Sequence, residues 1–276
     1  MNKKHRANSK LTVAAMQLNS GTDVQKNLDC IKSELDSLPK VPDVLVLPEV
    51  FNYRRMNFHE KNYTEKLSGK SIQFLQQSAK DMNMFIIGGS IPETGINNKA
   101  YNTSVVIDPS GEIYGIYRKM HLFDVMLEDK NILESNKYIP GTKPEIIDIH
   151  GWKVGLSICY DLRFPELFRW YFNHGAEILA IPSSFVFETG QKHWHILCQA
   201  RAIENQCFVI APNQCGIGAN DIKTFGHSLI IDPMGDVIAE AGEDHCTTII
   251  AELDRESMNN FRTNFPIKNH QRKELN

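Results

Sequence analysis

The chain has few cysteines, no excess charge of either sign and no long apolar run, and each shortage excludes a class of protein. Six cysteines in 276 residues are too sparse for a disulfide scaffold, and no two have the Cys-x-x-Cys spacing of zinc or redox motifs. Thirty Lys and Arg against thirty-three Asp and Glu leave a formal charge of −3, so no basic footprint for nucleic acid or an anionic membrane exists. We therefore expect a reduced, cytoplasmic protein whose partners are small molecules.

No apolar run approaches the length of a membrane span. The segment MNKKHRANSK followed by LTVAAMQL has the charge order of a signal peptide. Its apolar part, however, is only eight residues long, contains Gln17 and lacks a small-residue cleavage site. The sequence instead predicts a disordered tail over residues 1–10 and a strand from Leu11 to Leu18. No linker rich in glycine, serine or proline interrupts residues 11–276, so we expect a single domain there.

Short runs rich in valine and isoleucine alternate with longer segments of helical period, which is the pattern of an α/β protein. Asp23 is placed to cap a helix whose apolar residues follow in steps of three or four. Further helices are expected over residues 69–82 and 190–206. The apolar stripe of the last helix, which we assign to the core, consists of Ile196, Ala200 and Ile203.

The second half of the chain repeats segments of the first half in the same order. DVLVLPEVF at residue 43 aligns with EILAIPSSF at 177, FIIGGS at 85 with FVIAPN at 208, and SVVIDPSGEI at 104 with SLIIDPMGDV at 228. Three ordered matches at nearly constant offset predict two pseudo-symmetric β/α halves, each of which contributes one sheet with its helices outside. We therefore expect a four-layer αββα sandwich.

The two halves differ at the end of one matched strand. The first half has Pro48-Glu49 where the second has Pro182-Ser183. Because strand ends next to loops carry the binding sites of open α/β sheets, Glu49 is a candidate catalytic carboxylate. The alternative is a solvated or helix-capping glutamate.

Two further segments carry candidate chemistry. Cys159 lies in KVGLSICYDLRFPEL, between a strand predicted over Val154–Ile158 and a helix that Pro165 can begin. Such a turn exposes a side chain beside backbone N–H groups that favour a thiolate or an oxyanion, although a buried apolar cysteine is the alternative. Lys119, in YRKMHLFD, lies among aromatic and apolar residues, which suits a lysine held beside a pocket.

Taken together, these segments resemble the nitrilase superfamily of carbon-nitrogen hydrolases. The marks of that superfamily are a Pro-Glu strand end, a Tyr-Arg-Lys-x-His-Leu-Phe box and a Cys-Tyr-Asp-x-Arg-Phe-Pro-Glu box. This chain carries them at Pro48-Glu49, Tyr117 to Phe123 and Cys159 to Glu166. The resemblance covers nearly the whole chain. It implies the αββα fold and a triad of Glu49, Lys119 and Cys159 that needs no metal and no organic cofactor.

The resemblance also implies a role for each residue of the triad. Cys159 is expected to attack the carbonyl carbon of a small-molecule amide, with Glu49 as general base and acid. Lys119, assisted by the backbone N–H of Tyr160, is expected to stabilise the tetrahedral oxyanion. Ammonia then leaves, and water activated by Glu49 hydrolyses the thioester.

Members of the superfamily place a second glutamate beside the substrate. In ILESN the candidate is Glu134, fifteen residues after Lys119. The preceding loop, VMLEDKN, lacks the Pro-Gly that the superfamily commonly carries there, so Glu128 stays a competitor and the shape of this loop stays open.

Residues around the two boxes are further candidates for substrate contact. Arg163 either orients Asp161 or contacts an acidic substrate, whereas Glu166 is interpreted as an ion-pair or capping residue. Ser184 and Phe185 lie at the strand end that matches Glu49, and we expect both to face the same cleft. His193 and His195 flank a tryptophan, but residues two apart on a helix do not share a face, so we assign both to packing or hydrogen bonding and expect no metal site.

Within the superfamily, residues 183–216 are similar to the branch that contains deaminated glutathione amidase and omega-amidase. The Asn-Gln-Cys-Gly that ends this segment and the box beginning at Phe225 are more like the former. The resemblance implies that the substrate is the amide of a small carboxylic or 2-oxo acid, and we expect a homodimer or a higher homo-oligomer. An omega-amidase and a nitrilase with the same triad are the alternatives.

Overall fold

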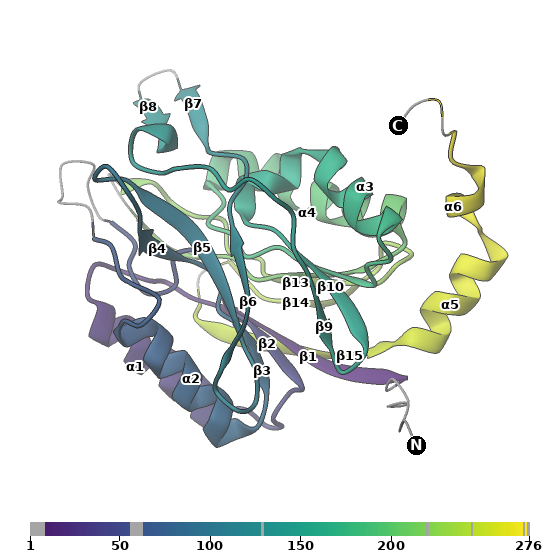
Figure 1. Cartoon of the computed structure of the whole chain (residues 1–276), viewed down its shortest axis with the longest axis horizontal. Helices are drawn as coiled ribbons and strands as arrows, with labels where there is room; N and C mark the ends of the chain where they lie inside the picture. The colour runs from purple at the N-terminus through teal and green to yellow at the C-terminus, as the bar shows by residue number, and fades with distance from the viewer. Residues whose placement is uncertain are drawn as a thin grey trace.

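The computed structural model describes residues 9–55, 63–127, 130–218, 221–243, 245–272 and 274. Two sheets face each other in the middle of the molecule, and helices cover their outer faces (Figure 1). Residues 1–8 of the predicted tail lie outside the described residues, and the first strand begins at Lys10, one residue earlier than expected.

The first sheet has the strand order β15-β1-β2-β3-β5-β4, with β6 paired to β5. Its strands are β1 (Lys10–Gln17), β2 (Val44–Val46), β3 (Phe85–Ile87), β4 (Ile91–Thr94), β5 (Ala100–Ile107), β6 (Ile113–Arg118) and β15 (Thr247–Asp254). The helices α1 (Val24–Asp36) and α2 (Lys70–Met82) connect the parallel strands β1, β2 and β3. Asp23 caps α1 as predicted, because its side chain accepts from the backbone N–H of Lys26.

The second sheet has the order β14-β13-β12-β11-β10-β9. Its strands are β9 (Ile146–Ile149), β10 (Trp152–Leu156), β11 (Ile178–Ala180), β12 (Phe208–Ala211), β13 (Leu229–Ile231) and β14 (Val237–Glu240). The helices α3 (Pro165–Asn173) and α4 (Phe187–Asn205) connect the parallel strands β10, β11 and β12. Both sheets thus combine helical crossovers with an antiparallel hairpin, β5–β6 in one and β13–β14 in the other, and the predicted repeat is confirmed.

The remaining elements lie outside the two large sheets. They are the hairpin of β7 (Asp124–Leu127) and β8 (Lys130–Leu133), the 3-10 turns η1 (Glu134–Asn136) and η2 (Cys159–Arg163), and the C-terminal helices α5 (Arg255–Asn264) and α6 (Ile267–His270). The segment VMLEDKN, whose shape the sequence left open, thus contributes to both strands of this short β-hairpin, and the hairpin leads into η1.

Alternation of side chains along the strands builds three apolar layers. Val44 and Val46 point into the layer between the sheets, whereas Leu45 packs under α1 and α2. In the second sheet Ile178 points into the middle layer and Leu179 packs under α3 and α4. With helices outside both sheets, this is the four-layer αββα sandwich that the repeat predicted.

The expected core stripe of α4 is wrong. Ile196 is 68% exposed and Ile203 46% exposed, whereas Trp194 and Cys198 are buried. Arg201 lies on the buried face, where its guanidinium donates two hydrogen bonds to a buried backbone carbonyl. The hydrophobic pattern therefore assigned the two faces of α4 wrongly. Arg201 lies on the buried face, whereas Ile196 and Ile203 lie on the exposed face.

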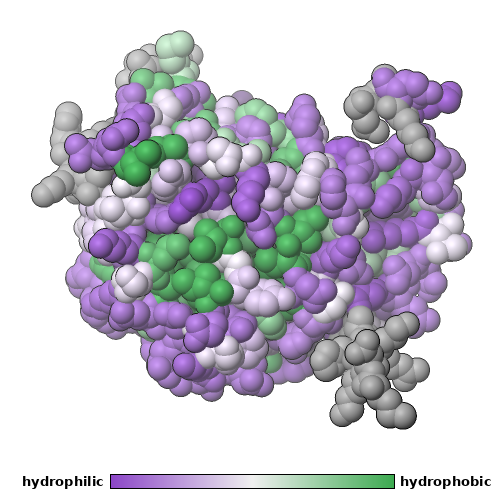
Figure 2. Space-filling model, viewed as in Figure 1, coloured by the Kyte–Doolittle hydropathy of each residue, from purple (hydrophilic) through white to green (hydrophobic). Residues whose placement is uncertain are grey.

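An apolar patch lies on the face shown in Figure 2, over the region of β5 and β6. Ile113, Tyr114 and Ile116 of the edge strand β6 are exposed. Contiguous apolar surface of this kind is typical of contact surfaces. Within the described part of the chain, no helix has the length and apolar character needed to cross a membrane.

Gly89 supports the loop that carries Glu49. Its φ is 45°, and a Cβ placed on it would lie 1.9 Å from the carbonyl oxygen of Pro48. Because the clash is with backbone, we expect Gly89→Ala to lower the free energy of unfolding by at least about 1–3 kcal/mol and to displace Glu49, with loss of activity. Urea unfolding measures the first effect. Gly242→Ala is the control, because a Cβ there meets no atom within 4 Å; equal losses in both variants would contradict this role of Gly89.

Candidate active site

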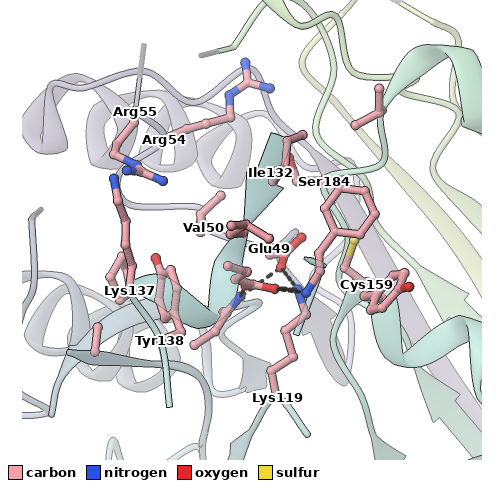
Figure 3. Close-up of a pocket in the computed structure, with 18 of the residues that line it drawn as sticks. Glu49, Val50, Arg54, Arg55, Lys119, Ile132, Lys137, Tyr138, Cys159 and Ser184 are labelled. Atoms are coloured by element: carbon pink, nitrogen blue, oxygen red, sulfur yellow. Dashed lines mark hydrogen bonds and ion pairs between the residues drawn. The ribbon is translucent and has the colours of Figure 1, made fainter. Parts of the chain in front are cut away.

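Three loops at strand ends bring Glu49, Lys119 and Cys159 together around one cavity (Figure 3). Glu49 follows β2, Lys119 follows β6, and Cys159 follows β10, so both sheets contribute. The cavity has a volume of about 380 Å³. Glu49 is 6% exposed and Lys119 only 2% exposed, whereas Cys159 is partly exposed. Charges buried this deeply need partners.

The buried charges satisfy one another. Lys119 Nζ lies 2.9 Å from Glu49 Oε1 and 3.0 Å from Glu134 Oε2 (Figure 3). Asn102 Nδ2 donates to the same two carboxylates, at 2.8 Å and 3.2 Å. The backbone N–H of Phe123 donates to Glu134 at 2.6 Å. The ammonium and the two carboxylates sum to a charge of −1, and hydrogen bonds compensate their removal from water.

These neighbours set the protonation of the lysine and the cysteine. Burial by itself lowers the pKa of Lys119, but the negative charges of Glu134 and Glu49 outweigh it and hold that pKa well above its usual value. Burial and the Glu49 carboxylate raise the pKa of the Cys159 thiol well above its usual value, against the opposing effects of Lys119 and the Ser184 N–H. At neutral pH the lysine is therefore charged and the free thiol keeps its proton.

Backbone strain occurs in the loops that carry Glu49 and Cys159. Cys159 has a φ of 46° and Val50 a φ of 51°, in a region that residues other than glycine rarely adopt and that β-branched residues such as valine adopt least. Hydrogen bonds hold both positions: the Cys159 N–H donates to the Pro182 carbonyl at 2.8 Å, and the Val50 N–H donates to Ser90 Oγ at 3.0 Å. The strained turn presents the thiol to the cavity that Glu49 also lines.

Asp161 joins the cysteine turn to the lysine segment, and the sequence analysis did not anticipate this role. It is fully buried. Its Oδ2 accepts from the Tyr117 hydroxyl at 2.7 Å and from the Ile158 N–H at 2.9 Å. Its Oδ1 accepts from the His121 N–H at 3.0 Å and lies 2.7 Å from His121 Nδ1. Tyr117 and His121 lie two residues on either side of Lys119, so one carboxylate fixes the lysine segment relative to the Cys159 turn.

The structure places the other predicted residues as follows. Glu134, Tyr160, Arg163, Ser184 and Phe185 all line the cavity. The geometry does not support Arg163 as the residue that orients Asp161, because Arg163 Nη1 lies 3.3 Å from His193 Nδ1 and its guanidinium lies over the Phe185 ring. Glu166 is exposed in the first turn of α3, where a negative charge complements the helix dipole. Glu128 lies outside the described residues.

Several basic residues of the cavity wall were missed by the sequence analysis. Arg54, Arg55 and Lys137 line the cavity together with Tyr138, and Figure 3 shows Arg55 and Lys137 across the cavity from Cys159. Arg54 is buried and donates to the carbonyls of residues 20, 215 and 217, and its burial lowers its pKa to about 10. With Arg163 they surround the cavity with positive charge, which suits an anionic ligand.

The chain matches the carbon-nitrogen hydrolase family model over residues 12–263. It is 36% identical over 241 residues to omega-amidase NIT2-A of Xenopus laevis, covering 87% of each chain. It is also 36% identical over 263 residues to the deaminated glutathione amidase of a Synechocystis species, covering 93% of this chain and 96% of that protein. The crystal structure of Saccharomyces cerevisiae Nit3, a member of branch 10 of the nitrilase superfamily, matches with a TM-score of 0.80 at 33% identity, covering 96% of this chain and 97% of that one.

The chain belongs to the carbon-nitrogen hydrolase family, and it is an enzyme that hydrolyses carbon–nitrogen bonds. The resemblance inferred from the Pro-Glu strand end and the two boxes is thereby confirmed.

The geometry of Asp161 makes its charge testable. Each of its oxygens accepts from a backbone N–H. In Asp161→Asn the side-chain NH2 group must therefore face another N–H donor, whichever way the amide group is turned. We expect this variant to lose about 1–3 kcal/mol of stability and most of its kcat/KM, measured by urea unfolding and by ammonia release. Asp232→Asn is the control, because a single oxygen of Asp232 accepts both N–H bonds of its hairpin turn and asparagine keeps that oxygen. Native behaviour of Asp161→Asn would contradict the proposed link.

Proposed function

We propose that this enzyme is a cysteine-dependent amidase that hydrolyses the amide of a small carboxylic or 2-oxo acid through a thioester and releases ammonia. The observation that carries the proposal is that Glu49, Lys119 and Cys159 line one cavity, in which Glu49 accepts a hydrogen bond from Lys119. The relatives named deaminated glutathione amidase and omega-amidase support this class of substrate, and we favour an activity like that of the first.

In the first half-reaction, Cys159 Sγ attacks the amide carbon while Glu49 accepts the thiol proton. The raised pKa of the Cys159 thiol makes this transfer to an adjacent base necessary, because little thiolate exists before substrate binds. The negative charge that develops on the carbonyl oxygen is stabilised by Lys119 Nζ and the backbone N–H of Tyr160. Glu49 then returns the proton to the amide nitrogen, the carbon–nitrogen bond breaks, and ammonia leaves with Cys159 acylated.

In the second half-reaction, Glu49 removes a proton from water, which attacks the thioester. The same oxyanion donors serve again, and the proton returns to the Cys159 sulfur as the acid leaves. The two halves together convert an amide and water into an acid and ammonia. These steps use no metal and no organic cofactor. Glu134 keeps Lys119 charged and in place throughout, since its carboxylate lies 3.0 Å from the ammonium.

The cavity supports an acidic substrate. A carboxylate buried with the amide needs a cationic or N–H partner. Arg163 is our first choice, because it lines the cavity on the same turn as Cys159 and its guanidinium lies 5.1 Å from the Phe185 ring centre. Phe185 offers an apolar face for the carbon chain of the substrate, and Ser184 is small enough to leave room for it.

The structure also bears on the expected assembly and compartment. Exposed apolar residues on the outer faces of α3 and α4, namely Trp170, Ile196 and Ile203, support the proposal of a homodimer. The six cysteines are all free thiols, which is compatible with the proposed cytoplasmic location.

The thioester is directly observable. We expect Cys159→Ala to abolish ammonia release and to form no acyl adduct, whereas Glu49→Gln should turn over about 10²- to 10⁴-fold more slowly and accumulate any acyl-enzyme that it forms. Intact-protein mass spectrometry after mixing with substrate measures the adduct. Cys198→Ala is the control, because Cys198 is buried under the second sheet, away from the cavity. Normal turnover by Cys159→Ala would refute the assignment of the nucleophile.

A substrate panel tests the function itself. We expect kcat/KM for deaminated glutathione and 2-oxoglutaramate to exceed that for neutral aliphatic amides of similar size, with nitriles inert. In Arg163→Ala this preference should shrink by at least about tenfold, since one charge-assisted hydrogen bond contributes about 1.5–3 kcal/mol. Lys153→Ala, on the exposed part of β10, is the matched control. Equal efficiency on acidic and neutral amides would refute the acidic-substrate proposal, and turnover of nitriles would favour the nitrilase alternative.

A further inference from the structure

A second constellation of chemically active side chains lies outside the cavity, on the surface where α4 meets the β13–β14 hairpin. His195 Nε2 lies 3.0 Å from Glu240 Oε1, and His227 Nδ1 lies 2.8 Å from the same oxygen. The three ligand atoms lie within 4.8 Å of one another. All three side chains are partly exposed, so an ion from solution has access to them.

A helix, a strand and a loop residue tied to both carry these side chains. His195 lies in the middle of α4 next to Trp194, which is fully buried and donates from its indole N–H to the His227 carbonyl at 2.7 Å. Glu240 ends β14, where it pairs with Leu229 of β13, and the His227 N–H donates to the Gly242 carbonyl just beyond this pairing. The positions of the three side chains are therefore determined by the fold before any ligand binds.

An aromatic side chain orients both imidazoles. The Phe225 ring stacks on His227 with the ring centres 4.4 Å apart, and it meets His195 edge to face at 5.9 Å. Phe225 is itself buried. The rings are thus held with one nitrogen each toward Glu240, and the sequence shows no sign of this because the three residues are far apart in the chain.

We propose that His195, His227 and Glu240 form a binding site for one divalent transition-metal ion of the zinc type. Two imidazole nitrogens and one carboxylate oxygen are a donor set that Zn²⁺, Co²⁺ and Ni²⁺ prefer. Ligands at tetrahedral angles around zinc are roughly 3.3 Å apart, so the observed separations need only small side-chain rotations to admit the ion. Water completes the coordination on the exposed side.

Binding requires a simple exchange at the two rings. Because a carboxylate can only accept, the ring nitrogen of each histidine that faces Glu240 donates in the hydrogen-bonded arrangement. When the metal binds at this nitrogen, the nitrogen gives its proton to water and the other ring nitrogen takes one up, so each neutral imidazole still carries one proton. The ion then connects α4 to the β13–β14 hairpin. Because Val186 and Thr189, at the start of α4, line the cavity, the ion also anchors the helix that borders the active site.

Zinc titration in competition with a chromophoric chelator tests the site. The protein carries Cys159→Ala, so that the active-site thiol does not compete for zinc. We expect one equivalent of zinc to bind. The substitutions His195→Ala, His227→Ala and Glu240→Gln should each weaken zinc binding by more than about 100-fold, which exceeds the cost of losing a hydrogen-bond partner of a ligand. His270→Ala, on α6, is the control and should bind as the parent does.

Cobalt binding and unfolding separate the remaining outcomes. Co²⁺ at this site should show d–d absorption without a thiolate charge-transfer band. Glu240→Gln keeps the shape of the side chain, so native circular dichroism with lost binding identifies a ligand and not a folding defect. The proposal is overturned if no equivalent binds, if binding survives all three substitutions, or if the cobalt spectrum shows a thiolate ligand from the cysteines.

Discussion

Lys119 is an ammonium group buried between two carboxylates, and the rest of the active site is organised around the need to compensate those charges. Removing an ion from water costs several kcal/mol, which only close partners and further hydrogen bonds offset. Glu49, Glu134 and Asn102 meet that need from three separate segments of the chain. The segments are thereby held at one point, and the same contacts that stabilise the charges place the Glu49 carboxylate in the cavity that Cys159 lines.

The sandwich determines where this point lies. In the first sheet β6 runs in the same direction as the parallel strands β2 and β3, because β6 is antiparallel to β5 and β5 is antiparallel to β3. The loops after β2 and β6 therefore leave the same edge of that sheet, and they meet the loop after β10 of the second sheet around one cavity. The internal repeat alone would make the two halves equivalent. Function comes from the differences between them: Glu49 where the other half has Ser183, and a strained turn at Cys159.

Much of the fold and site was predictable because the signals are local. Alternating apolar residues, the cap at Asp23 and Pro165 at the start of α3 act within a few residues of chain, and each was predicted correctly. The face of α4 was predicted wrongly, because Arg201 is stabilised on the buried side by hydrogen bonds to a carbonyl from another element. Hydrophobic periodicity contains no information about such a partner.

Residue types at fixed spacing were enough to predict the α/β class, the repeat and the family, and the same spacing is the basis of the proposed triad. Contacts between remote segments emerge only in the folded chain. Asp161 bonds across to Tyr117 and His121, and Glu240 meets two histidines from other elements. A buried carboxylate and a surface carboxylate look alike in a sequence, because desolvation and hydrogen-bond geometry exist only once the chain has folded.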